Sequence, residues 1–537
     1  MVCAAGAGDE KIFGMGSGRR VRGALAAMLA AMALLCLGWR LAHGFYFQPF
    51  GDETGHLLGA QAINNGGVLY RDYIDDHGPV PYALAQLYGA LAGWSHPTRA
   101  RLIPALLALA GILAVSGSPA LQGRWERLLA GGTLAAFLAT AWLVQGLCLV
   151  DYQPMAGFFL LVALALFTAP AWAGVMPASW AAAGGGACCV FTCFIAYSYG
   201  PSAVLLFGGG VWAARGAWRQ VVLPACAGAC AAFAAMALWL IAFSDLRGFV
   251  VFHFIHSQLY YGPYLHYDPL MALRALVPGR GPLRRVQEVA VAAGGLAVLV
   301  FFGPSLLRRG WRAVGPAALA GLALAFSNPR GSPIFQNGAF VVLSFGFLAL
   351  ALARAPRAFG VVGGWLVQAR FAVMASCVLV ALSAEAMCRR AYSTPHQFTR
   401  AQMLAQPPQA LGLSQGPWAV ALRRATAPDE RILALPFDPM LYFQAGRQPM
   451  RGYYLYLPWD ADYARRPWFG VTHDLCVDLQ KDPPPVVFYN GWVVWDQYDP
   501  RVYMKCVLDV IAKLYVPAPG APDFFVRRDR LKVWQGS

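Results

Sequence analysis

Acidic, histidine and arginine residues gather in one short stretch of an otherwise apolar chain. They form three motifs: Asp52-Glu53-Thr-Gly-His56, Tyr70-Arg71-Asp72 and Asp75-Asp76-His77-Gly-Pro. Carboxylates and imidazoles can take up or release protons, and arginine can bind the oxygens of a phosphate group. These residue types therefore indicate acid–base chemistry beside an anionic ligand.

The first motif also has a simpler structural interpretation. Asp and Glu are favoured at the start of a helix, where they accept hydrogen bonds from free backbone N–H groups. Asp52 and Glu53 could therefore cap a helix that follows them. Asp151 has the same two interpretations, since Pro154 after it suits the first turn of a helix. Spacing alone favours capping for Asp52 and Glu53 and leaves Asp151 open.

Composition shows what kind of fold must position these residues. The chain has 537 residues, of which 58% are apolar and only 13% are charged, about half the charged share of a typical soluble domain. This excludes a disordered chain, a fibrous repeat, a small disulfide scaffold and an ordinary cytosolic enzyme. A mainly α, polytopic membrane protein is the class that remains.

About eleven apolar runs predict membrane-spanning helices. They are Ala24–Leu41, Leu102–Ser116, Leu128–Val144, Met155–Ala171, Trp180–Ala196, Ser202–Ala214, Val221–Phe243, Val289–Leu306, Val314–Phe326, Ala339–Ala353 and Phe371–Glu385. Arginine-rich turns fall on one side if residues 1–22 form a cytoplasmic tail, as the positive-inside rule requires. The net charge of +16 then reflects topology and requires no nucleic acid.

This topology predicts a transmembrane domain over residues 23–386 with two long outer loops, 45–98 and 244–288. The run Pro79–Trp94 in the first loop is too short to cross and return, so we expect a helix lying in the interface. Most acids and all histidines before residue 386 fall in outer loops. A transporter tends to keep such groups within its spans, so this pattern favours chemistry at the membrane surface.

Residues 387–537 predict a small α/β domain on the outer side. Its expected strands are Ile432–Leu435, Tyr453–Leu457, Val486–Tyr489, Leu514–Val516 and Phe524–Val526, and its expected helices include 474–481 and 499–513. Cys476 and Cys506 lie on these two helices. They are a disulfide candidate if the domain faces an oxidising space, but sequence does not show that they meet.

Residues 45–110 resemble the first outer loop of the GT-C superfamily of integral-membrane glycosyltransferases that use polyprenyl-phosphate sugars. The most similar group contains lipid A aminoarabinose transferases and protein O-mannosyltransferases. Four elements occur here in the same order: Asp52-Glu53, Gly66 to Asp72, Asp75 to Pro79, and Arg101-Leu102. The resemblance implies inverting transfer of a sugar from an undecaprenyl-phosphate type of donor to a cell-envelope acceptor.

The resemblance also implies roles for single residues. Asp52 becomes the catalytic base with Glu53 beside it, and Asp151 a second carboxylate that orients the acceptor or binds a metal. His77 stands where similar enzymes often carry lysine before proline, which leaves the contact to the donor phosphate open. The candidates for that contact are His77, Arg71, Arg101 and, in the second outer loop, Arg280.

Further polar residues of the outer loops are candidates for acceptor contacts or for structural roles: Asp72, Asp76, His253, His256 and Tyr260. The i, i+3 spacing of His253 and His256 places both on one helix face, where Asp151 could complete a site for Zn²⁺, Mn²⁺ or Mg²⁺. An interfacial belt of Tyr and His is the simpler interpretation of this cluster. No cofactor is therefore firmly predicted.

The expected partners are a polyprenyl-phosphate-linked sugar donor, a lipid, glycan or protein acceptor, and membrane lipids. Arginine far outnumbers lysine, and Ala and Gly are abundant, which suggests a GC-rich bacterial genome. We therefore expect the bacterial inner membrane, with a cytoplasmic N-terminus and a periplasmic C-terminal domain. The alternative from another class is a transporter, flippase or assembly partner for lipid-linked saccharides that transfers no sugar.

Overall fold

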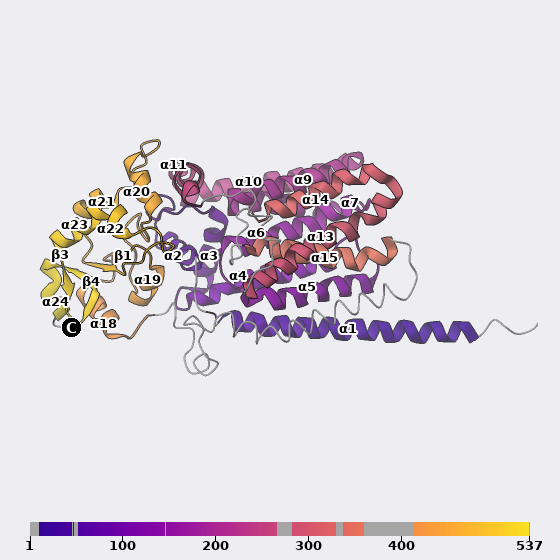
Figure 1. The fold of residues 1–537 in the computed structure, drawn as a ribbon, viewed down its shortest axis with the longest axis horizontal. Helices are drawn as coiled ribbons and strands as arrows, with labels where there is room; N and C mark the ends of the chain where they lie inside the picture. The colour runs from indigo at the N-terminus through magenta and orange to yellow at the C-terminus, as the bar shows by residue number, and fades with distance from the viewer. Residues whose placement is uncertain are drawn as a thin grey trace, which may run out of the picture.

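The computed structural model describes residues 10–45, 47, 52–144, 146–265, 282–328, 337–358 and 413–535. A bundle of long helices occupies most of its length, and a smaller part with a sheet lies at one end (Figure 1). Helices α2 (Glu53–Asn64) and α3 (Pro79–Ala92) lie where these two parts meet. The predicted fold class, a polytopic helix bundle with a small C-terminal α/β domain, is confirmed.

Helices occupy each predicted span up to residue 353. They are α1 (Glu10–Gly44), α4 (Leu102–Ser116), α5 (Arg124–Val144), α6 (Tyr152–Ala163) continued by η2 (Leu164–Thr168) and α7 (Ala169–Trp172), α8 (Ser179–Ile195), α9 (Gly200–Ala213), α10 (Leu223–Phe243), α13 (Pro282–Arg309), α14 (Val314–Phe326) and α15 (Gly338–Ala358). The last predicted span, 371–385, lies outside the described residues. Short segments η4 (Arg215–Ala217), η5 (Trp218–Val222) and η8 (Gly310–Ala313) connect neighbouring helices.

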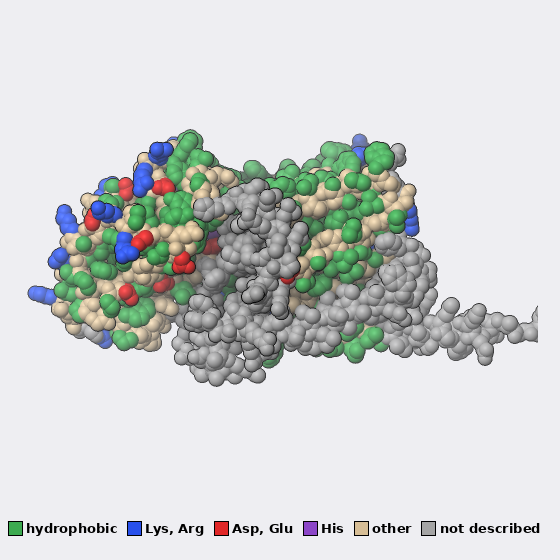
Figure 2. Space-filling view, viewed as in Figure 1, with side chains coloured by type: hydrophobic (Ala, Val, Ile, Leu, Met, Phe, Trp, Pro, Cys, Tyr) green, Lys and Arg blue, Asp and Glu red, His purple; other side chains and the backbone are tan. Residues whose placement is uncertain are grey.

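The bundle has the composition of a membrane protein. Among the described residues, six helical segments are long and apolar enough to cross a membrane: Ala24–Gly44, Pro97–Ser116, Tyr152–Trp172, Arg215–Phe243, Glu288–Arg308 and Gly338–Ala355. Large apolar side chains such as Leu35 and Leu113 are more than 70% exposed, and apolar side chains spread over the visible face of the bundle (Figure 2). Such a surface requires lipid around it.

Small residues allow the helices to approach closely. A Cβ atom at Gly186 of α8 would lie 2.0 Å from the Ala225 oxygen of α10, and one at Gly228 of α10 would lie 2.0 Å from the Ala183 oxygen of α8. These two glycines therefore let two backbones touch. Gly186 thus serves helix packing, as its apolar surroundings predict.

The two outer loops are helical over much of their length. The first ends in η1 (Pro97–Arg101), and the second contains α11 (Leu246–Phe249), the π-helix η6 (Val250–Tyr261) and η7 (Gly262–Leu265). The predicted interfacial helix forms as α3. Helix α13 begins at Pro282, inside the segment predicted as loop, because a helix can continue past its apolar run into a polar first turn that tolerates proline.

The C-terminal part contains a four-stranded sheet in the order β1-β2-β4-β3, with β1 and β2 parallel and the other pairs antiparallel. Its elements are α18 (Pro417–Ala425), β1 (Leu433–Leu435), α19 (Pro439–Ala445), α20 (Pro458–Arg465), α21 (Leu475–Lys481), β2 (Val486–Tyr489), α22 (Pro500–Tyr503), α23 (Lys505–Leu514), β3 (Tyr515–Ala518), β4 (Ala521–Arg527), η11 (Arg528–Arg530) and α24 (Leu531–Gln535).

The strand predicted over 453–457 is wrong, because this segment makes only isolated bridges. Its consecutive tyrosines serve two different cores. Tyr453 packs inside the C-terminal domain, whereas Tyr454 packs with the first outer loop. Alternation of side chains toward two cores therefore resembles a strand in sequence, although the backbone here pairs with no neighbouring strand.

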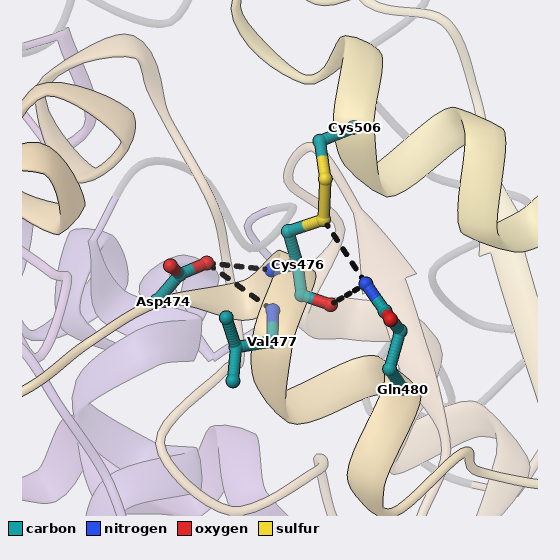
Figure 3. The surroundings of a disulfide bond; sticks show 5 residues. All are labelled: Asp474, Cys476, Val477, Gln480 and Cys506. Atoms are coloured by element: carbon teal, nitrogen blue, oxygen red, sulfur yellow. Dashed lines mark hydrogen bonds between the residues drawn. A yellow bond between two sulfur atoms is a disulfide. The ribbon is translucent and has the colours of Figure 1, made fainter.

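Cys476 on α21 and Cys506 on α23 form a disulfide (Figure 3). Their Cα atoms are 5.8 Å apart and 30 positions separate them in sequence. Asp474 caps the start of α21 by accepting hydrogen bonds from the N–H groups of Cys476 and Val477. The bond therefore fastens two short helices that pack on the same side of the small domain.

Replacing both cysteines by serine should lower the free energy of unfolding by about 4 kcal/mol, the entropy of closing a loop of this size. Thermal unfolding of the purified protein, followed with and without reductant, measures this loss. Cys230→Ser is the matched control, because Cys230 is exposed and free. An equal effect of reductant on wild type and the double variant would contradict the prediction.

Candidate functional site

The site is built around the buried carboxylate of Asp75, which follows the first outer helix α2. Its Oδ1 accepts hydrogen bonds from the Nδ1 atom of His77 at 2.6 Å and from the His77 backbone N–H at 3.1 Å. Its Oδ2 accepts from the hydroxyl of Tyr82 on α3 and from the hydroxyl of Tyr454 at 2.8 Å. Both oxygens of a buried charge are therefore satisfied.

His77 carries a positive charge in this setting. Burial alone would lower its pKa, but the carboxylates of Asp75 and Asp76 outweigh burial and raise the pKa of His77 to about 10. The Asp76 Oδ1 lies 3.4 Å from Nδ1. Conversely, the imidazolium outweighs the effect of burial on Asp75 and holds the pKa of that carboxyl well below its usual value. The other ring nitrogen, Nε2, lies 3.7 Å from Oδ2 of Asp52.

Asp52 stands directly before α2 but does not cap it. Its side chain makes no hydrogen bond to the free N–H groups of the helix, and 34% of that side chain is exposed. The capping interpretation thus places the residue correctly but not its carboxylate. The carboxylate turns instead toward His77, at the open side of the site.

Glu53, the next residue, lies in a completely different environment. It is fully buried and forms an ion pair with Arg101, whose Nε donates to Oε1 at 2.8 Å. The same Oε1 accepts from the N–H of Val150 at 3.1 Å, and Arg101 also donates to the Gly44 oxygen at 2.8 Å. This closed pair ties the ends of α1, α2 and α4 together.

Asp151 caps α6, since its Oδ1 accepts from the N–H of Tyr152 at 2.7 Å. The same oxygen lies 3.9 Å from Nδ1 of the buried His56. Burial, and then the negative charge of nearby Asp52, raise the pKa of Asp151 well above its usual value. Asp151 therefore combines the capping role with a place beside Asp52, where its environment favours the protonated form of the carboxyl group.

The connection from α2 to His77 is held tightly. Tyr70 adopts a φ of 63°, in the left-handed region that disfavours large side chains. Its hydroxyl donates to the His77 oxygen at 2.7 Å.

Burial, with the charge of Asp75 acting against that of His77, raises the pKa of Asp76 to about 6. The Asp76 backbone oxygen accepts from Nδ1 of His253 at 3.1 Å.

Among the described residues, one group has the ligands and spacing for a metal ion: His56, Asp75 and His77, whose ligand atoms lie within 4.8 Å of one another. Burial, and then the charge of His77, lower the pKa of His56 to about 3, and its Nε2 has no hydrogen-bond partner among these residues. Two imidazoles and a carboxylate suit Zn²⁺. The metal set predicted from sequence is not assembled, because Nε2 of His256 lies 3.1 Å from Asp460 instead.

Of the predicted phosphate ligands, His77 is the one beside Asp52. Arg71 is 60% exposed and pairs with Asp72 at 2.9 Å, and Asp72 also accepts from the N–H of Val68 at 3.0 Å. Arg101 is bound to Glu53, and Arg280 lies outside the described residues. The structure therefore separates three pairs that look alike in sequence. Arg71 and Asp72 lie on the surface, Arg101 and Glu53 are buried, and His77 and Asp52 form an open pair at the site.

The C-terminal domain contacts both outer loops. The ring of Tyr454 stacks on Tyr73 with centroids 4.5 Å apart, and the Gly452 N–H donates to the Asp72 oxygen at 2.8 Å. From the second loop, the hydroxyl of Tyr260 donates to the Arg466 oxygen at 2.6 Å. Sequence reasoning missed Tyr82 and Tyr454, because nothing local marks a tyrosine as the partner of a distant carboxylate.

No family model and no curated protein matches the chain in sequence. Solved structures do share its fold. ArnT from Cupriavidus metallidurans in the apo state has a TM-score of 0.55 at 15% identity, covering 97% of this chain and 99% of that chain. The same protein bound to undecaprenyl phosphate has a TM-score of 0.44 at 15% identity, covering 79% and 84%.

AglB from Archaeoglobus fulgidus, an archaeal oligosaccharyltransferase in complex with an inhibitory peptide and a dolichol-phosphate, has a TM-score of 0.46 at 13% identity, covering 95% of this chain and 74% of that chain. The likeness to apo ArnT, which extends over almost the whole of both chains, establishes the fold. The chain therefore has the GT-C-like membrane fold that its first outer loop predicts.

The charge on His77 gives stability a definite pH dependence. Its pKa is about 10 in the fold against 6.5 in the unfolded chain. The stabilisation from this group is therefore complete below pH 6.5 and is lost as pH rises toward 10. The excess stability of wild type over His77→Gln should shrink across that range, as measured by thermal unfolding.

His473→Gln is the control for this experiment. His473 is also buried, but burial lowers its pKa to about 4, so it is neutral above pH 6.5 in both states. Its effect on stability should therefore stay constant from pH 6.5 to 10. A constant effect for His77→Gln over the same range would disprove the charged imidazole.

Proposed function

We propose that the protein is a membrane glycosyltransferase that moves a sugar from a polyprenyl-phosphate donor of the undecaprenyl type to a cell-envelope acceptor. The observation that carries this proposal is the open pair of Asp52 and His77. The carboxylate of Asp52, which is partly exposed and does not cap α2, lies 3.7 Å from the charged imidazole of His77. The chain that carries this pair has a GT-C-like fold. A base and a cation are the two groups that this transfer requires.

In the proposed reaction, Asp52 takes the proton of the acceptor hydroxyl while that oxygen attacks the anomeric carbon. The bond from the anomeric carbon to the phosphate oxygen breaks on the opposite face, so the configuration inverts. The bonding electrons leave with the polyprenyl phosphate, and the imidazolium of His77 offsets the charge that develops there. The acceptor leaves as a glycoside, and the proton stays on Asp52.

The neighbouring residues fit supporting roles in this scheme. The ion pair of Glu53 and Arg101 fixes the start of α2 and therefore the position of Asp52. The raised pKa of Asp151 favours its protonated form, which donates a hydrogen bond near Asp52 and adds no second negative charge. We assign Arg71 and Asp72 to the surface beside the site rather than to contact with the phosphate.

The location that we propose is the bacterial inner membrane, with the site on the periplasmic side. The disulfide between Cys476 and Cys506 supports an oxidising space around the C-terminal domain. The site lies at the end of the bundle where that domain contacts the outer loops, within reach of a donor whose lipid tail stays in the bilayer. We place the domain boundary near residue 387 and assign acceptor contacts to the C-terminal domain.

Asp52→Asn should reduce transfer at least about 100-fold, because the amide cannot accept the proton in the reaction. The measurement is mass spectrometry of envelope glycolipids and glycans from a deletion strain complemented with wild type or variant, which also identifies the sugar and its acceptor. Asp72→Asn is the matched control, since that carboxylate is tied to Arg71 and Val68. Near wild-type product with folded Asp52→Asn would refute the assignment of the base.

An assay with purified protein separates the enzyme from the transporter or flippase. A flippase forms no covalent product, so purified protein would convert no donor in detergent, whatever the residue at position 52. Conversion of a radiolabelled lipid-linked sugar by wild type, and its loss in Asp52→Asn, would exclude that alternative.

A metal ion offers a second way to bind the donor phosphate. Zn²⁺ or Mn²⁺ held by His56, Asp75 and His77 would act as a Lewis acid toward a phosphate oxygen. His77, however, already donates through Nδ1 to Asp75 at 2.6 Å, and a ligand nitrogen must be free of its proton. We therefore favour the imidazolium as the group that contacts the phosphate.

His77→Lys distinguishes these two roles, because lysine keeps the positive charge but replaces the imidazole ligand. We expect His77→Lys to retain transfer within about tenfold of wild type, and His77→Gln to lose about 100-fold. Initial rates with and without EDTA complete the test. Loss of wild-type activity in EDTA that Zn²⁺ or Mn²⁺ restores would contradict the prediction and assign the metal role.

A further inference from the structure

A cavity of about 580 Å³ lies at the end of the bundle far from the candidate site. It is bounded by the end of α7, the turn after α9, the end of α13, the start of α14 and the second half of α15. These helix ends lie at the end of the bundle away from the C-terminal domain (Figure 1). Lys and Arg side chains are visible at this end of the bundle (Figure 2). The cavity has a size typical of sites for small ligands.

The lining has a pronounced charge pattern. It contains three arginines, Arg215, Arg308 and Arg354, and no acidic residue among the described part of the chain. The arginines come from three separate elements, η4, α13 and α15. Three guanidinium groups around one cavity present many N–H donors to one anion, and guanidinium matches the geometry of phosphate oxygens.

Two of these side chains are held in place by aromatic rings. The guanidinium of Arg354 lies 4.7 Å from the ring centre of Phe301, and its Nη1 donates to the Phe301 oxygen at 3.4 Å. The guanidinium of Arg215 lies 5.8 Å from the ring centre of Trp212. Positioned cations lose less entropy when an anion binds than freely moving ones.

The surroundings of the cavity point to a lipid as the source of the anion. Leu307 and Trp311, close to Arg308 in sequence, are each 81% exposed, and Trp218 near Arg215 is 57% exposed. Such side chains require contact with a bilayer, and tryptophan favours the level of the headgroups. Basic pockets between membrane helices at this level suit anionic headgroups.

We propose that this cavity binds the headgroup of an anionic phospholipid, with its phosphate between Arg215, Arg308 and Arg354. The acyl chains would then follow the apolar outer faces of α13 and α14. The positive-inside rule alone explains arginine in these turns, but it requires no cavity and no convergence of arginines from three elements. The site is separate from Asp52 and His77, at the opposite end of the bundle.

The test measures binding of phosphatidylglycerol to the full-length protein in detergent by native mass spectrometry. We expect Arg308→Gln/Arg354→Gln to bind this lipid at least about tenfold more weakly than wild type, since two charge-assisted contacts are lost. The matched control is Arg124→Gln/Arg127→Gln, at the start of α5, which removes the same charge outside the cavity. This control should bind within about twofold of wild type.

Two further arms separate the sources of the anion. Phosphatidylcholine should bind at least about tenfold more weakly than phosphatidylglycerol, and inorganic phosphate at millimolar concentration should not displace the bound lipid. Equal loss in the control variant, equal binding of both lipids, or displacement by phosphate would each overturn the proposal. If the double variant elutes as aggregate, Arg308→Gln alone applies the same criterion, because this residue is exposed at a helix end.

Discussion

The buried carboxylate of Asp75 is the interaction on which the rest of the site depends. A charge in this position is tolerated only because three partners donate to it: His77, Tyr82 and Tyr454. These partners come from the loop after α2, from α3 and from the C-terminal domain. One carboxylate therefore keeps His77 protonated, orients its free nitrogen toward Asp52, and joins the small domain to the membrane bundle.

Environment, rather than residue type, divides the work among the acids of the site. Glu53 is neutralised in a closed pair with Arg101, and burial beside another carboxylate raises the pKa of Asp151 well above its usual value. Asp52 alone combines an exposed edge with a facing cation. Neighbouring carboxylates thus become an ion-paired group, a group of raised pKa and a partly exposed group, which is the usual way in which one site obtains different acid and base functions.

The two ends of the bundle carry opposite chemistry. Acids, histidines and tyrosines gather where the outer loops contact the C-terminal domain, and arginines line a cavity at the other end. The small domain belongs to the first end in a literal sense. Tyr454 completes the hydrogen bonding of Asp75, and Asp460 lies against His256 of the second loop. The geometry of the residues at this end therefore depends on the position of the C-terminal domain.

The sequence by itself determined the membrane helices, the small α/β domain and the two motifs that contain Asp52 and His77. Each of these rests on local composition or on residues close in the chain. It could not distinguish Asp52 from Glu53, because at the start of a helix two adjacent side chains point in different directions. Asp52 is partly exposed beside His77, whereas Glu53 is buried against Arg101. It wrongly predicted a strand over 453–457. It also missed the contact between Tyr454 and Asp75, which are 379 positions apart. Only the tertiary structure decided which carboxylate is buried in an ion pair, which has a raised pKa and which is partly exposed, because burial and long-range partners set the environment of each one.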